Sequence, residues 1–174
     1  YFQLQVILAY NLFMKSSIQD KSKLVNSVFS RVYKKYDLMN DIMSLGIHRI
    51  WKNKLIDWMN PQLDENLIDV ASGTGDIAKL FSKKNNNSAN ISCVEPNDEM
   101  LKIGKVNLKK FKNIKWHKAT GEKLPFKNNT YNFYTISYGI RNVSDINLSL
   151  KEAFRVLKPG GRFMCLEFSK IDNE

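Results

Sequence analysis

The spacing of hydrophobic positions changes between residues 62 and 67 of this chain. Before that point, apolar side chains recur every three or four residues, which is the period of an amphipathic helix. After it, short apolar runs alternate with segments of helical spacing. The runs predict strands at 67–71, 90–95, 113–117, 131–137 and 162–168, and the other segments predict helices at 76–84, 97–110 and 145–157. This alternation is typical of an α/β fold, with a doubly wound, mostly parallel sheet covered by helices on both faces.

The N-terminal pattern predicts a helical cap on this sheet. A helix that Pro61 closes has four apolar side chains at helical spacing: Ile50, Trp51, Leu55 and Trp58. Tryptophans so placed are more often part of a core than of a binding surface, so we expect both to be buried. The predicted organisation is an N-terminal extension at 1–20, a helical cap at 21–62 and the α/β domain at 63–174.

The segment LIDVASGTGD at 67–76 is the first candidate for chemistry. A strand that runs through a glycine turn into a helix leaves backbone N–H groups free beside a ligand. The spacing D-x-A-x-G-x-G is neither a dinucleotide fingerprint nor a phosphate-binding loop with its lysine. Asp69, at the strand end, would repel a pyrophosphate and attract an ammonium group. The turn therefore indicates a nucleotide-like cofactor that carries a cationic amino acid.

An acidic residue ends the next predicted strand. Glu95 lies 20 residues beyond Gly75, where a carboxylate of a doubly wound sheet accepts hydrogen bonds from ribose hydroxyls. Met100 could pack on the base. Asn97 or Asp98 can cap the helix that follows, Asp145 can cap the last helix, and KPGG at 158–161 predicts a helix stop and a turn.

Together these features resemble class I S-adenosylmethionine-dependent methyltransferases. Five segments in order, spanning roughly residues 25–170, are similar to the ubiquinone/menaquinone biosynthesis C-methyltransferase family: YDLMNDIMSLGIHRIWK (36–52), DVASGTGD (69–76), LPF (124–126), YGIRNVSD (138–145) and RVLKPGGRFMCLEFSK (155–170). The class has the sheet order 3-2-1-4-5-7-6. RFMCLEFS is apolar on both faces and few residues follow it, so we expect that the C-terminal strands are missing from this chain.

The resemblance implies S-adenosylmethionine as the cofactor. It places cofactor contacts on Asp69, Ser72, Gly73, Thr74, Gly75, Glu95, Thr120, Gly121 and Ser137. Two departures from the family stand out. The family usually has glycine where Ser72 stands, and Asp-Ala or Asn-Ala where Thr120 and Gly121 stand, so recognition of the adenine amino group is expected to differ.

The resemblance also implies a reaction, C-methylation of a polyprenylated benzoquinol or demethylmenaquinol ring in ubiquinone or menaquinone biosynthesis. Such a ring carbon becomes nucleophilic when a ring hydroxyl loses its proton, so catalysis should combine alignment, deprotonation and exclusion of water. The residues predicted to contribute are Arg141, Asn142 and Tyr36.

Composition limits the classes of binding partner that this chain is expected to have. The net charge is +10, yet only five of the 27 basic residues are arginine and the lysines are scattered, which resembles codon bias more than a nucleic-acid surface. The scattered lysines therefore predict no nucleic acid as partner. No run reaches the roughly 18 apolar residues of a spanning helix, so we expect contact with the membrane to be peripheral, through anionic lipid. The expected location is cytoplasmic and membrane-associated, or the matrix side in a mitochondrion, with a possible homodimer or quinone-biosynthesis complex.

Cysteines and histidines add no metal site to this picture. Cys93 and Cys165 lie within apolar runs, which predicts two buried thiols in a reducing compartment. His48 and His117 lack metal-ligand spacing, and His117 is expected to be structural.

Three alternatives stay open at this stage. The chain could methylate another small molecule or lipid on the same fold, although the segments 36–52 and 138–145 favour a quinol. It could be a nucleic-acid-binding or RNA-modifying protein, which the charge suggests and the scattered lysines disfavour. It could also be a truncated, non-catalytic chain.

Overall fold

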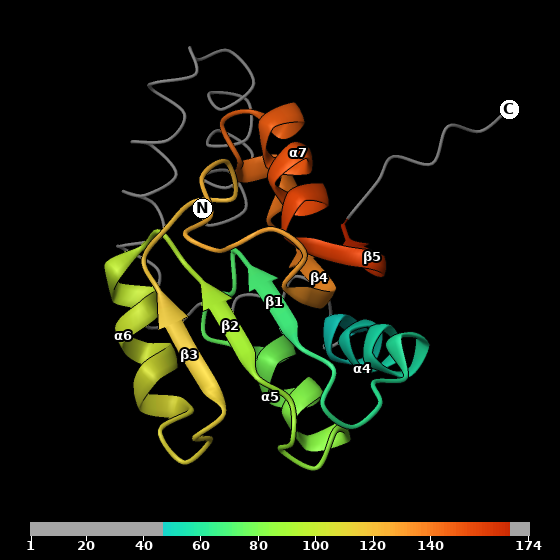
Figure 1. The fold of residues 1–174 in the computed structure, drawn as a ribbon. Coiled ribbons are helices and arrows are strands. Elements are labelled where there is room, and N and C mark those ends of the chain that lie inside the picture. The colour runs from blue at the N-terminus through green and yellow to red at the C-terminus, as the bar shows by residue number, and fades with distance from the viewer. Residues whose placement is uncertain (1–46, 168–174) are drawn as a thin grey trace, which may run out of the picture.

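The structure is a computed structural model that describes residues 47–167. A parallel five-stranded sheet with the order β3-β2-β1-β4-β5 forms its centre (Figure 1). The strands are β1 (Leu67–Val70), β2 (Ile91–Val94), β3 (Ile114–His117), β4 (Tyr131–Ser137) and β5 (Leu157–Leu166). The helices are α4 (Ile47–Met59), α5 (Asp76–Lys84), α6 (Asp98–Asn107), the 3-10 helix η2 (Ile140–Asn142) and α7 (Ile146–Val156). The predicted α/β class and the order of the five strands are confirmed.

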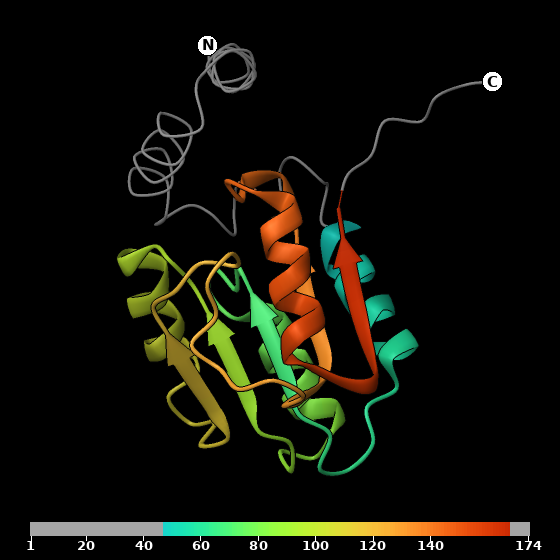
Figure 2. The same ribbon diagram turned by 45° about the horizontal axis from the view of Figure 1, so that its top comes forward.

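Helices cover both faces of the sheet. Figure 2 shows α7 across one face, with α4 and α5 behind the other. On the α4 and α5 side, Phe81 is fully buried and meets Phe133 edge to face, with ring centroids 5.5 Å apart. On the α7 side, Val156 and Tyr134 are fully buried. All four residues of β1 are buried, as expected for a central parallel strand.

The helix ends follow the capping signals in the sequence. The Asn97 side chain accepts hydrogen bonds from the backbone amides of Glu99 and Met100, and the Asp145 side chain accepts one from Leu148. Helix α6 ends at Asn107, three residues before its predicted end, and Leu108 follows as its C-cap.

The orientation of α4 differs from the prediction. Of its four predicted core residues only Leu55 is buried, whereas Trp58 is 74% and Trp51 40% exposed. The buried residues of α4 are His48, Leu55, Ile56 and Met59. The prediction for the tryptophans was wrong because α4 carries two apolar stripes, and packing against α5 and β5 buries the other one.

Strand β5 also corrects the sequence analysis. It begins at Leu157, and the predicted KPGG turn is a register shift within the strand, with Gly160 at φ +78°. Cys93 is buried as predicted, but Cys165 is exposed. The reason is position: β2 lies inside the sheet, whereas β5 is its edge strand among the described residues.

Several predictions fall outside the described residues. They are the extension at 1–20, the cap up to residue 46, Tyr36 and the expected absence of strands beyond β5. Within the described range, none of the helices has the length and apolar character needed to cross a membrane.

Candidate functional site

The candidate site lies at the carboxyl edge of the sheet, where β1 runs into the glycine turn and α5. The turn uses left-handed backbone at Ala71, Gly73 and Gly75, with φ of +53°, +56° and +89°. A Cβ at Gly75 would lie 2.6 Å from Leu108 Cδ1 and 3.0 Å from the Trp116 ring. At Gly73 a Cβ would lie 3.6 Å from Met100 Cε, an ordinary van der Waals contact, so a side chain here would meet no steric clash.

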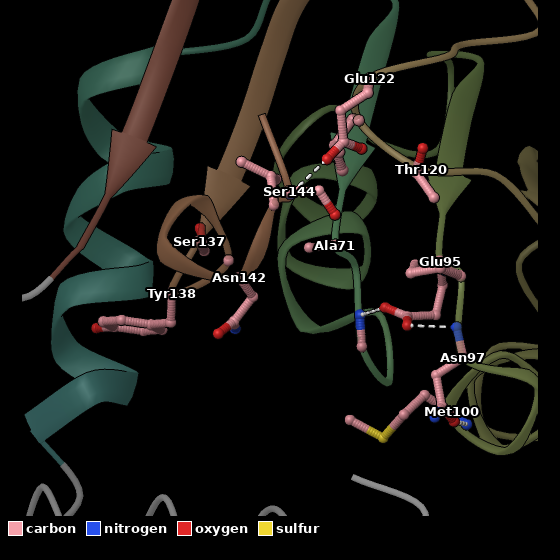
Figure 3. A pocket seen from close by; sticks show the side chains of 16 residues that line it. Ala71, Glu95, Asn97, Met100, Thr120, Glu122, Ser137, Tyr138, Asn142 and Ser144 are labelled. Carbon is pink, nitrogen blue, oxygen red and sulfur yellow. Dashed lines mark hydrogen bonds between the residues drawn. The ribbon is translucent and has the colours of Figure 1, made fainter. Parts of the chain in front are cut away.

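Glu95, which follows β2, holds the turn in place. Its carboxylate accepts hydrogen bonds from the backbone amides of Gly73 and Asn97, each at 2.9 Å (Figure 3). Glu95 is 6% exposed, and burial raises the pKa of its carboxyl, although these two hydrogen bonds oppose the shift. Each oxygen keeps a further lone pair, so the carboxylate can still accept from a ligand.

A cavity of about 180 Å³, here called the main cavity, opens between the ends of β1, β2 and β4. Its walls include six of the predicted site residues: Gly73, Glu95, Thr120, Gly121, Ser137 and Asn142. Met100 and Tyr138 line it as well, and Figure 3 shows them on opposite sides of the glycine turn. Residues 95–100 and 120–122 thus meet beside one opening, although they come from separate loops.

Asp69 is the most perturbed carboxylate of the site. It is buried at the sheet centre, and its Oδ1 accepts a hydrogen bond from Thr135 Oγ1 at 2.7 Å. Its Oδ2 is buried without a hydrogen-bond partner in the described part of the chain. Desolvation raises the pKa of Asp69 to about 7, against the hydrogen bond from Thr135 and the attraction of Lys52.

A smaller cavity of about 30 Å³, here called the side cavity, lies on the other side of the turn. Asp69, Ser72 and Thr74 line it, and it shares Gly73 and Ser137 with the main cavity. The Ser72 hydroxyl donates to the Asp69 carbonyl at 2.6 Å, so the serine that departs from the family pattern bonds to its own turn.

These groups fit the cofactor that the sequence implies. Glu95 offers acceptors for ribose hydroxyls beside the main cavity. The orphaned Asp69 Oδ2 offers a buried acceptor for an ammonium group. The mainly apolar main cavity suits an adenine, with Met100 and Pro96 in its wall.

Two predicted site residues within the described range line neither cavity. Gly75 has a structural role instead, because a Cβ at this position would clash with Leu108 and Trp116. Arg141 lies in η2, next to Asn142, and forms an ion pair with Glu167, which follows β5. Tyr36 lies outside the described residues.

Sequence reasoning missed further residues that line the side cavity, among them Lys52, Asp76 and Tyr138. Each belongs to a segment that resembles the family, namely 36–52, 69–76 and 138–145, which was a usable signal. Tyr138 has φ +57°, a conformation that a tyrosine rarely adopts and that no sequence pattern reveals. Lys52 comes from α4, whose orientation was predicted wrongly.

Comparison with known proteins gives a consistent picture. The model of the ubiE/COQ5 methyltransferase family matches residues 15–174. The "Ubiquinone/menaquinone biosynthesis C-methyltransferase UbiE" of Rickettsia bellii is 53% identical over 165 residues, and that of Rickettsia prowazekii 52%. Each alignment covers 91% of this chain and 66% of the relative, so the chain spans just under two thirds of the length of these relatives.

Solved structures share the fold. The YcgJ protein from Bacillus subtilis has a TM-score of 0.61 at 25% identity, covering 67% of this chain and 50% of that one. A SAM-dependent methyltransferase from Aquifex aeolicus has a TM-score of 0.58 at 23% identity, covering 62% of this chain and 58% of that one.

Proposed function

The chain belongs to the ubiE/COQ5 methyltransferase family, and from that premise we propose that it uses S-adenosylmethionine to methylate a ring carbon of a polyprenylated quinol in ubiquinone or menaquinone biosynthesis. One observation supports this most directly. Glu95 and Asp69, which end neighbouring strands, bring two buried carboxylates to cavities on either side of a glycine turn. That arrangement suits a ligand that carries both a ribose and an ammonium group.

Residues at the carboxyl edge of the sheet would bind and orient the cofactor. When bound, the cofactor supplies a methyl group on a sulfonium. Glu95, held against the glycine turn, would accept from the ribose hydroxyls, and Asp69 would accept from the ammonium group. Thr120 and Gly121 line the main cavity. By the resemblance to the family they would face the adenine, with the Thr120 hydroxyl in place of the usual carboxylate or amide.

Arg141 and Asn142 would activate the quinol. The Arg141 guanidinium, held by Glu167, places a positive charge beside the opening where Asn142 lines the main cavity. A nearby positive charge favours the ionised form of a ring hydroxyl, whose proton passes to water. The negative charge of such a phenolate would be shared with the ortho carbon, the position that would accept the methyl group while the sulfonium leaves as a neutral thioether.

A direct assay tests this proposal. The chain is incubated with S-adenosylmethionine and, in separate reactions, a short-tailed benzoquinol or demethylmenaquinol under reducing conditions, and the product is analysed by mass spectrometry and NMR. A new methyl group on a ring carbon supports the proposal. A methyl group on oxygen, or cofactor binding without transfer to either quinol class, contradicts the assignment of substrate and favours another small molecule or lipid.

The raised pKa of Asp69 predicts a pH dependence of cofactor binding. The folded-state pKa of about 7 lies above the ordinary 3.8, so the stability that neutral Asp69 contributes is complete below pH 3.8 and is lost as the pH rises through 7. A ligand ammonium favours the ionised carboxyl, so binding below pH 7 releases a proton. We expect affinity to fall about tenfold per pH unit well below 7, and to fall again above ~8 where the ligand amine deprotonates.

Calorimetry in buffers of different ionisation enthalpy measures that proton. Asp69→Asn should bind more weakly and lose the acid limb of the profile. An acid limb of unchanged slope in Asp69→Asn would assign the titration to another group.

We also propose peripheral membrane contact, which the insolubility of a polyprenyl tail requires. The net charge of +10 supports attraction to anionic lipid, and exposed Trp51 and Trp58 on α4 support insertion at an interface. Flotation with anionic vesicles, but not with neutral ones, is the expected result. A cytoplasmic, membrane-associated location and a homodimer or quinone-biosynthesis complex stay predictions, the latter testable by light scattering.

A further inference from the structure

The side cavity contains charges of both signs, which the glycine turn alone would not provide. Asp69 and Asp76 contribute carboxylates, and Lys52 from α4 contributes an ammonium group. Among the residues described, Lys52 is the one lysine or arginine that lines either the main or the side cavity. The two cavities share Gly73, so a ligand that fills the first reaches the second across this glycine.

Lys52 is more buried than two lysines that form ion pairs on the protein surface. Its side chain is 12% exposed, compared with 61% for Lys118 and 68% for Lys102 in other ion pairs. Its Nζ donates to Asp76 Oδ2 at 2.8 Å, which uses one of the three donors of an ammonium group in the described structure. A partly buried lysine with donor capacity at a cavity wall is suited to binding an anion.

The size of the side cavity limits what it can accept. At about 30 Å³ it exceeds the ~10–15 Å³ that one water-sized group needs, so it admits about two such groups. An α-amino acid end presents two small groups of this kind, an ammonium and a carboxylate. The carboxylates of Asp69 and Asp76 suit the first and repel the second, so the second requires a cation.

We propose that Lys52 binds the carboxylate of the amino-acid end of the cofactor, and that it thereby makes α4 part of the cofactor site. This assignment rests on the proposed function for the identity of the ligand. The remaining Lys52 donors serve the carboxylate while the bond to Asp76 keeps the side chain aimed into the side cavity. Asp76 begins α5, so the same contact ties α4 to the helix that follows the glycine turn.

Three ligands that differ in one group each separate the possible roles of Lys52. S-adenosylmethionine has the whole amino-acid end, decarboxylated S-adenosylmethionine lacks only the carboxylate, and 5′-methylthioadenosine lacks the entire end. For the unchanged chain, we expect calorimetry to show ~10–100-fold tighter binding of S-adenosylmethionine than of the decarboxylated form, as one charge-assisted hydrogen bond implies.

In Lys52→Met this preference should disappear, while affinity for 5′-methylthioadenosine changes less than about twofold. Lys52→Arg, which keeps the charge, should retain most of the preference for S-adenosylmethionine. Lys54→Met is the matched control, because Lys54 lies on the same helix, is exposed and lines neither cavity. Thermal unfolding of each variant reports whether α4 still packs.

The outcomes are distinguishable. If the unchanged chain binds S-adenosylmethionine and Lys52→Met keeps the preference for it, the Lys52 assignment is overturned and the proposed function stands. Equal weakening of all three ligands by Lys52→Met also overturns it, since that is the result of a structural ion pair. If the unchanged chain is folded and binds none of the three, both the proposed function and this assignment are overturned.

Discussion

Replacing Glu95 with alanine is expected to weaken S-adenosylmethionine binding at least ~100-fold, the largest effect on affinity of any single site residue. Two contributions add. The variant loses charge-assisted hydrogen bonds to two ribose hydroxyls, each of which contributes about 1.5–3 kcal/mol. It also leaves the buried amides of Gly73 and Asn97 without the acceptor that fixes the glycine turn.

Isothermal calorimetry measures this effect, and two further variants separate its causes. Glu95→Gln keeps the shape and one acceptor oxygen but loses the charge, so an intermediate loss of about tenfold is expected. Glu99→Ala is the matched control, because Glu99 lies on α6 four residues away and pairs only with solvent-exposed Lys102 among the described ion pairs. Affinity within threefold of the unchanged chain for folded Glu95→Ala would remove Glu95 from the cofactor site.

Replacing Gly75 with alanine is expected to lower the free energy of unfolding by about 2–5 kcal/mol. Part of the loss is the left-handed backbone, with φ +89°. The rest is steric, since the new Cβ would lie 2.6 Å from Leu108 Cδ1 and 3.0 Å from Trp116, and Leu108 is buried. For a domain whose total stability is about 5–15 kcal/mol, this is a large fraction.

Gly73→Ala is the matched control in the same turn. Gly73 also has positive φ, +56°, but its Cβ would have 3.6 Å to the nearest atom, so only the backbone cost of about 1–2 kcal/mol remains. Urea unfolding followed by tryptophan fluorescence and far-ultraviolet circular dichroism compares the two variants. Equal destabilisation by both would show that packing under the turn plays no part.

The resemblance to the family and the α/β fold follow from the sequence because both depend on local patterns. Period-two and period-3.6 spacings reflect which faces must be buried, so β1 to β4 and α5 fall close to their predicted ranges. Caps depend on a few neighbouring residues, and Asn97 and Asp145 act as predicted. The chemistry of the strand ends also follows, because parallel strands bring Asp69 and Glu95 to one edge.

Predictions failed where a residue's environment depends on distant parts of the chain. Trp58 has helical spacing, but only packing decides which of two apolar stripes on α4 is buried. Cys165 lies in an apolar run as long as that of Cys93, but a place at the edge of the described sheet exposes it. The role of Arg141 stays a prediction: its side chain pairs with Glu167 and lines neither cavity.

The sequence by itself determined the cofactor edge, because the identities and spacing of Asp69, Gly73 and Glu95 specify a turn and two strand ends whatever surrounds them. Only the tertiary structure decided the pKa of Asp69 at that edge and the presence of Lys52 beside it. Burial at the sheet centre brings the pKa of Asp69 to about 7. The packing of α4 against α5 places Lys52 beside it, 17 residues away in the sequence. Desolvation and long-range packing are properties of the assembled fold, and no local pattern encodes them.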